Sequence, residues 1–476
     1  MKRILAILLV PVIVAAMAVG AAAESGPLSE DVAAEEPDFA NSVFDTSYVH
    51  TIDVRISEGD WNDLLEHPTD KTKYKADVVI DGETVEDVSF ATKGHSSLYF
   101  VADNPESQRY SFKITFGNGE EKPTWHGLRK LNLNNSFSDP TYMKDYLSYG
   151  LFGKMGVAAP RASYIWVTIN GEAQGLYVAI EEVDQSLLDR AFGGEGTLYQ
   201  PEHEDIDPEL FQLIKEGGSA HREGANGADF AYTDDLPEHY SDIFDNAATK
   251  EDPETQARVI RALKGLSERE DLDSYLDTKA IIRFFAVHNF LVNFDSYTGP
   301  MLHNWYLYEN NGRLSVVPWD YNLILGAFSA DGVTGHKNDS SLVINQGIDS
   351  PLSGSPATEA ERPMWSWIME DDTYRAQYHD VLRELISEHF ESGGFTEEFD
   401  ALHAMLLPYV EQDPTAFCTA ERFTAGYEAM RELILLRAES IRRQLDGELS
   451  TVTEQQRESD RVDIPGISIY DAKLPL

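Results

Sequence analysis

The chain contains little cysteine and little positive charge. Its single cysteine, Cys418, cannot form an internal disulfide, so the fold must be held together by its apolar core. Lysine and arginine number 38 against 82 aspartates and glutamates, which gives a formal net charge of −44 at pH 7. We do not expect such an acidic chain to bind nucleic acid or an anionic membrane surface. This excess of acidic residues either keeps the protein soluble or attracts a partner rich in lysine and arginine.

Long hydrophobic runs are absent except at the N-terminus. A short basic start precedes an apolar stretch from Ile4 to Val19, and three alanines at 21–23 provide a small-residue cleavage site. This pattern predicts that residues 1–23 are a secretory signal peptide, with a retained membrane anchor as the alternative. We therefore expect an exported protein of the cell envelope or the exterior, with no stable membrane span after cleavage.

Composition and periodicity divide the rest of the chain into a β-rich part and a helical part. Residues 24–45 are acidic and without periodicity, which is typical of a linker. Residues 46–182 carry mostly strand and turn patterns, residues 183–446 carry mostly helical patterns, and residues 447–476 form a polar tail. The expected fold is α+β, with a β-rich N-terminal lobe, a helical C-terminal lobe and a cleft between them.

Strand and turn patterns are clearest between residues 46 and 182. A hairpin is predicted over Ala162–Val183, where two alternating stretches flank Asn170-Gly171, the pair favoured in a type I′ turn. One helix is expected from Tyr142 to Met155, capped by Asp139 with Pro140 at its first position. Further strands are predicted at Val49–Ile56, Tyr74–Ile80, Val85–Ala91 and Tyr110–Phe116.

Helical periodicity dominates after residue 183. Asp252-Pro253 is expected to open one helix, and Asp277 to cap a buried helix over Thr278–Val292, whose apolar residues surround much of the cylinder. A hairpin pattern follows at Asn304–Val317, around an Asn-Asn-Gly turn. Further helices are predicted near residues 372–390, 396–412 and 420–445, and long loops at residues 217–238 and 327–361.

Two aspartates flank the 304–317 hairpin. Asp295 comes directly after the buried helix, and Asp320 follows the second strand after Pro318-Trp319. Phosphoryl transfer needs a carboxylate that orients the attacking hydroxyl, oxygen ligands for a divalent metal and a cation for the phosphates. Asp295 suits the first role and Asp320 the second, and Asn304 offers another oxygen ligand. Each residue alone is more readily explained as a turn, a cap or an ion-pair partner; only the combination indicates a site.

The same residues lie within a series of motifs that are found together in a known family. The chain resembles the spore-coat protein H (CotH) kinases, which are atypical protein kinases with a diverged, two-lobed kinase-like fold. The resemblance covers about residues 48–326. In chain order, its motifs are Lys93–Ser97, Ser111–Phe116, Leu131–Asn135, Met143–Asp145, Met155–Arg161, Asn170–Glu172, Gly175–Tyr177, Glu181–Asp184, Asn293–Tyr297, His303–Tyr308 and Pro318–Tyr321.

The resemblance implies a protein kinase that phosphorylates serine or threonine of a partner protein, using ATP and Mg²⁺ or Mn²⁺. It implies that Asp295 is the catalytic aspartate and that Asp320 binds the metal. It also implies that Lys113 holds the phosphates, with Lys93 and Glu181 as further contacts to the nucleotide. Because the chain is strongly acidic, we expect its protein substrate to be basic and rich in serine.

Two positions depart from the family pattern. Leu98 follows Gly-x-Ser-Ser where the family commonly has arginine, and Asn322 stands where a second aspartate is common. Asn322 can still bind a metal through its carbonyl oxygen, with one negative charge fewer. These departures leave open a second hypothesis, a non-catalytic surface or envelope module that retains the fold. Paired carboxylates would also suit a glycan hydrolase or transferase, which the resemblance to kinases disfavours.

Overall fold

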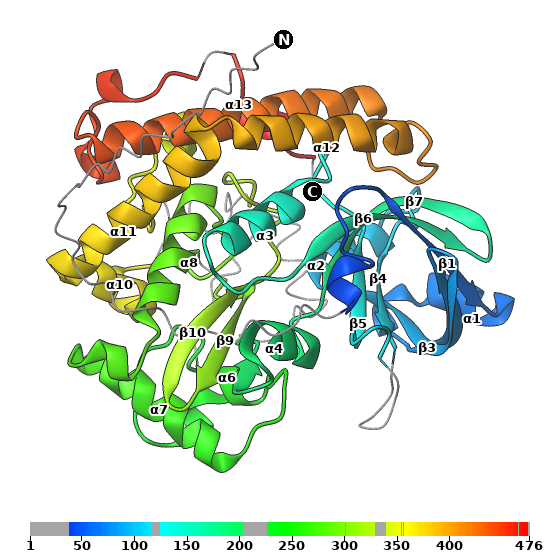
Figure 1. Ribbon diagram of the computed structural model, residues 1–476, viewed down its shortest axis with the longest axis horizontal. Coiled ribbons are helices and arrows are strands. Elements are labelled where there is room, and N and C mark those ends of the chain that lie inside the picture. The colour runs from blue at the N-terminus through cyan, green and yellow to red at the C-terminus, as the bar shows by residue number, and fades with distance from the viewer. Residues whose placement is uncertain are drawn as a thin grey trace, which may run out of the picture. The chain divides into compact units, whose positions relative to one another are not determined.

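A computed structural model of the chain describes residues 38–116, 124–202, 226–299, 301–328, 339–353, 355, 357–464 and 466–474. The predicted signal peptide and most of the predicted linker lie outside these residues. From Glu36 onward the chain forms one compact unit. Its architecture is mixed α+β, as predicted: a closed β-barrel, a second small sheet and a set of helices (Figure 1).

The barrel contains seven strands in the order β1-β2-β3-β4-β5-β7-β6. It closes because β1 pairs in parallel with β6, from His50 opposite Ile165 to Val54 opposite Ile169. The predicted hairpin around Asn170-Gly171 forms β6 and β7 and is confirmed. The strands are β1 His50–Ile56, β2 Tyr74–Ile80, β3 Glu83–Lys93, β4 Ser111–Thr115, β5 Lys130–Asn134, β6 Ala162–Ile169 and β7 Glu172–Glu181.

The interior of the barrel is an apolar core that also includes residues N-terminal to β1. Phe39, Val43 and Phe44 are buried in this core, the first of them in a 3₁₀-helix at Asp38–Asn41. Burying each of these side chains contributes about 1.5–3 kcal/mol, and together they oppose the entropy cost of ordering the segment. Packed structure therefore begins inside residues 24–45, the range that the sequence assigned to an acidic linker.

Three helices accompany the barrel: α1 Glu58–Glu66, α2 Ser96–Ala102 and α3 Lys144–Lys154. The predicted start of α3 is wrong. Tyr142 has a φ of 60°, a left-handed conformation that a right-handed helix cannot contain, so α3 begins only at Lys144. Asp139 does not act as its N-cap; its carboxylate instead accepts the backbone N–H groups of Thr141 and Lys144 across this turn.

The second sheet has the order β10-β9-β8, with β8 Thr197–Tyr199, β9 Trp305–Asn310 and β10 Arg313–Pro318. The predicted hairpin at 304–317 is thus confirmed. The predicted cap Asp277 is confirmed, since it accepts the N–H of Ala280. The helix predicted to open at Asp252-Pro253 is confirmed too, and Asp252 caps it by accepting the N–H of Thr255. The helices here are α4 Gln185–Phe192, α6 Ser241–Phe244, α7 Pro253–Glu268 and α8 Thr278–Leu291.

Helices α11 and α13 contact α8, α10 packs against α7 and α11, and α12 lies along α13 (Figure 1). The residues predicted as a polar tail return onto this part of the fold: Leu449, Val462 and Ile469 are buried, and the N–H of Leu474 donates to Ser138. None of the described helices is both long enough and apolar enough to cross a membrane. The helices are α9 Ser340–Ile344, α10 Pro363–Glu370, α11 Asp372–Leu385 with a π-helix at Ile386–Glu391, α12 Gly394–Val410 and α13 Ala420–Leu445.

Candidate active site

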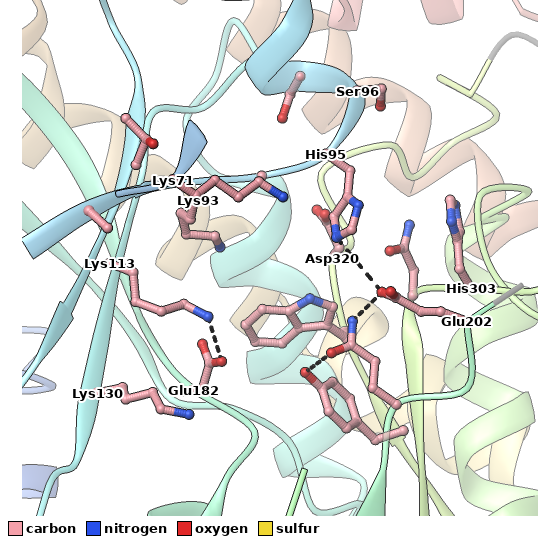
Figure 2. A pocket seen from close by; sticks show the side chains of 18 of the residues that line it. Lys71, Lys93, His95, Ser96, Lys113, Lys130, Glu182, Glu202, His303 and Asp320 are labelled. Atoms are coloured by element: carbon pink, nitrogen blue, oxygen red, sulfur yellow. Dashed lines mark hydrogen bonds and ion pairs between the residues drawn. The ribbon is translucent and has the colours of Figure 1, made fainter. Parts of the chain in front are cut away.

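A cavity of about 390 Å³ lies between the barrel and the second sheet. This volume is within the range of small-molecule sites. Figure 2 shows lysines on its barrel side and acidic side chains with His303 on the opposite side. We call the barrel side the lysine face; its lysines are Lys71, Lys73, Lys93, Lys113 and Lys130. We call the opposite side the carboxylate face; it includes Glu202, Asp295, His303, Asn304 and Asp320.

Asp295 is held in position from three directions. It lies just beyond the end of α8, where its N–H donates to the side chain of Asn293 at 3.1 Å. His303 Nε2 is 2.8 Å from one carboxylate oxygen, and Asn304 Nδ2 donates to the other at 2.9 Å. Burial works to lower the pKa of His303, but the adjacent Asp295 raises it above its usual value. The raised pKa favours the charged form of the histidine, and the contact orients the carboxylate.

The β9–β10 hairpin brings Asp320 to the same side of the cavity. It aligns Trp305 with Pro318, and the N–H of Trp319 donates to the carbonyl oxygen of Asn304 at 3.3 Å. The segment between Asn304 and Asp320 therefore consists mainly of the two strands of one hairpin and their turn. This pairing brings Asn304 and Asp320, which are sixteen positions apart in the sequence, to one site.

Helix α3 supports the turn that carries Asp320. The N–H of Asp320 donates to the hydroxyl of Tyr149 at 3.0 Å, and that of Tyr321 donates to a carboxylate oxygen of Asp145 at 2.9 Å. Sequence reasoning assigned no role to Asp145, although it lies in the Met143–Asp145 motif. The side chain is buried, and its other oxygen accepts from Asn134 Nδ2 at 3.2 Å.

The carboxylate face carries an excess of buried negative charge. Burial and the proximity of Asp320 raise the pKa of Asp145 to about 7. Burial also raises the pKa of Asp320; Lys93 opposes this shift, and Asp295 adds to it. A divalent cation near Asp320 would relieve this repulsion, and oxygen ligands from Asp320 and Asn304 suit Mg²⁺ or Mn²⁺.

A metal ion at this place would need ligands from a bound molecule. Within the described ranges, no three or more histidine, cysteine, aspartate or glutamate side chains are grouped so that they could hold one. Mg²⁺ typically takes one or two carboxylates and fills its remaining positions with water and substrate phosphates. The residues present therefore fit a metal that arrives with a phosphate chain.

Two lysines of the lysine face are held by neighbouring polar side chains. Lys113 donates to Glu182 at 2.7 Å, and Asn132 Nδ2 donates to the other oxygen of Glu182 at 2.6 Å. Burial works to raise the pKa of Glu182, but Lys113 and Lys130 lower it to about 2. Lys93 donates to Asn134 at 2.9 Å, and its pKa is lowered by burial and by Lys113.

Two sequence-predicted site residues, Glu181 and Asn322, do not reach the cavity, and neither does Leu98. Glu181, expected to contact the nucleotide, pairs with Arg190 at 2.7 Å outside it. Successive residues along a strand point to opposite faces, so Glu182 rather than Glu181 lines the cavity. Asn322, expected as a metal ligand, donates to the carbonyl of Phe137 at 3.4 Å and is not part of the lining. Leu98 is buried in the barrel core.

A buried histidine, which sequence reasoning missed, joins the two aspartate-bearing turns. His288 on α8 contacts the hydroxyl of Tyr321 through Nδ1 at 2.9 Å and that of Thr298 through Nε2 at 2.8 Å. Burial lowers its pKa to about 3, so the ring is neutral at physiological pH. The available sequence signal was a titratable residue within the mostly apolar stretch Phe284–Leu291 of this helix.

Comparison with known sequences gives a family match that includes Lys113, Asp295 and Asp320. The sequence model of the family described as CotH kinase protein matches residues 90–441. Inner spore coat protein H of Bacillus subtilis (strain 168) is 22% identical over 384 residues, which cover 80% of this chain and 95% of that protein. Invasin CotH7 of Rhizopus delemar is 21% identical over 380 residues, which cover 78% of this chain and 57% of that protein.

Proposed function

Because the chain belongs to the CotH kinase protein family, we propose that it is an ATP-dependent protein kinase that phosphorylates serine or threonine of a partner protein. The observation that carries this proposal is the cavity itself, in which the lysine face lies opposite Asp295, Asn304 and Asp320. Cations for phosphates, oxygen ligands for a metal and an oriented carboxylate are the parts that phosphoryl transfer requires. In this proposal the barrel and the helical part serve as the two lobes of a diverged kinase-like fold.

The lysine face would hold the phosphates of ATP. Lys113 is placed for this role by Glu182, in the manner of the lysine–glutamate ion pair of protein kinases. Here the glutamate follows the end of β7 instead of lying on a helix. Lys93 and Lys130 flank the pair and add positive charge along the same face.

The carboxylate face would carry out the transfer. A serine hydroxyl attacks the γ-phosphorus, a new oxygen–phosphorus bond forms, and the bond to the departing ADP breaks. Asp295, fixed by His303 and Asn304, orients this hydroxyl and accepts its proton. Asp320 and the amide oxygen of Asn304 are the groups that would hold Mg²⁺ or Mn²⁺, whose charge offsets that of the phosphate oxygens.

The setting that we propose is outside the cytoplasm. One relative is named as a spore coat protein and another as an invasin, names that fit an exported or surface protein. The predicted signal peptide agrees with this location. A basic, serine-rich protein is the substrate that suits a chain with a net charge of −44.

A phosphotransfer assay tests the proposal. The chain from residue 24 onward is incubated with labelled ATP, Mg²⁺ or Mn²⁺, and a basic, serine-rich protein. We expect label transfer from the wild type and its loss, by at least a hundredfold, in Asp295→Asn and Asp320→Asn. Asp372→Asn is the matched control, since the Asp372 side chain is 92% exposed and lies outside the cavity; it should transfer label like the wild type.

The assay also separates the non-catalytic alternative. That hypothesis arose from Leu98 and Asn322, neither of which lines the cavity in this chain. Binding of ATP to the wild type without transfer, under all metal conditions, would favour a non-catalytic module. If the wild type neither binds ATP nor transfers label, both proposals are wrong.

A further inference from the structure

Two lysines at the mouth of the cavity lie outside the residues that the family match covers. Lys71 and Lys73 are exposed and line the cavity, whereas the match begins at residue 90. They lie between a 3₁₀-helix at Pro68–Asp70 and the start of β2. Figure 2 shows Lys71 beside Lys93 on the lysine face. Residues before the matched region therefore extend the lysine face to the mouth of the cavity.

The segment that carries these lysines is anchored on both sides. Before it, the hydroxyl of Thr92 donates to the carbonyl of Pro68 at 2.6 Å. After it, the hydroxyl of Tyr74 donates to Asp63 at 2.7 Å. Lys71 adopts a left-handed conformation, with a φ of 51°. The backbone is thus held so that both side chains can reach the mouth, which lowers the entropic cost of binding a ligand there.

The charge of these two lysines is not offset locally. Neither forms an ion pair with any described residue, although the chain has more than two acidic side chains for every basic one. Lys75, two residues further on, behaves differently: it pairs with Asp87 at 3.2 Å and does not line the cavity. The positive charge is therefore concentrated at the mouth and is available to an anion that enters.

The composition of the cavity indicates which anion this is. Glycine-rich loops bind phosphates through backbone N–H groups, but Gly94 is the only glycine among the described residues that line the cavity. Lysine side chains must then supply most of the phosphate contacts. An acidic protein also repels a nucleotide that approaches it, and exposed cations at the mouth of a cleft offset that repulsion.

We propose that Lys71 and Lys73 form a cationic clamp that binds the terminal phosphates of the nucleotide at the mouth of the cavity. This inference rests on the proposed function, because it assumes that the cavity binds ATP. It adds a binding element from the N-terminal strands to the lysine face. Because both side chains are exposed, the clamp acts mainly on nucleotide affinity, and salt weakens its contribution.

Isothermal titration calorimetry with ATP, ADP and adenosine tests the clamp. In the chain from residue 24 onward, the double variant Lys71→Ala/Lys73→Ala should bind ATP roughly five- to thirtyfold more weakly than the wild type at low salt. The loss should be smaller for ADP, absent for adenosine and reduced at high salt. Lys75→Ala should match the wild type, and Lys71→Arg/Lys73→Arg should restore much of the affinity for ATP.

The outcomes distinguish the clamp from the proposed function. If the wild type binds ATP and the double alanine variant binds it equally well, the clamp is wrong and the proposed function stands. If the variant loses affinity for adenosine as much as for ATP, the substitutions have altered the cavity as a whole, and the clamp is again wrong. If the wild type binds no nucleotide, the proposed function and the clamp are both overturned.

Discussion

Substituting glutamine for Glu182 removes one negative charge from the lysine face while keeping the shape of the side chain. The carboxylate accepts hydrogen bonds from Lys113 and Asn132. Burial works to raise its pKa, but the attraction of Lys113 and Lys130 lowers it from 4.5 to about 2. A pKa that is lower in the folded state stabilises the fold at pH values above 4.5, and this contribution is lost as the pH falls toward 2.

The size of the effect follows from this shift. A lowering from 4.5 to about 2 corresponds to about 3 kcal/mol of folding free energy at neutral pH, and to roughly half of that near pH 3. Glutamine resembles the protonated acid, so Glu182→Gln should be less stable than the wild type by these amounts. The variant cavity is also more positive, so inorganic phosphate should bind to it more tightly. Turnover should fall, because Lys113 loses the charged partner that positions it.

Urea unfolding of both proteins at pH 7, 5 and 3 measures the stability difference, and titration with inorganic phosphate measures the anion affinity. Glu181→Gln is the matched control for anion affinity, because it breaks an ion pair with Arg190 outside the cavity. It should leave phosphate binding unchanged. A Glu182→Gln variant as stable as the wild type at pH 7, or a stability difference that does not shrink between pH 5 and pH 3, would refute this electrostatic argument.

Three further predictions concern buried groups. His288→Phe removes the hydrogen bond to Tyr321, so in steady-state assays kcat should fall by at least tenfold with little change in the KM for ATP; an unchanged kcat would contradict this positioning role. Asp413→Ala leaves Arg109 buried without its carboxylate and should cost about 3–5 kcal/mol in urea unfolding, whereas a loss below 1 kcal/mol would contradict it. Phe39→Ala should cost about 3–5 kcal/mol by the same measurement, and no loss would show that this segment does not support the barrel.

Helices and strands that are specified by turn or cap residues nearby in the sequence were predictable from the sequence. The Asn170-Gly171 pair sets a hairpin, and Asp252 and Asp277 cap helices, because these preferences depend on residues within a few positions of one another. The start of α3 was not predictable in this way. It depends on the left-handed conformation of Tyr142, a buried residue whose ring packs against Phe423 from α13.

The candidate site was only partly predictable. Its motifs pointed to Asp295, Asp320 and Lys113, and the structure brings all three to one cavity. The motif at the end of β7 did not tell which of two adjacent glutamates faces that cavity. A shift of one residue along a strand reverses the direction of the side chain, so only the packed barrel distinguishes Glu182 from Glu181.

By itself, the sequence determined the family, the acidic character of the chain, and the helices and strands that local patterns specify. The tertiary structure decided how these parts meet: β1 closes the barrel against β6 more than a hundred residues away, and the barrel then carries Lys113 to face Asp320. The physical reason is that caps, turns and periodicity act between near neighbours in the chain. A binding cavity depends on contacts between distant segments, and those form only when the apolar core packs.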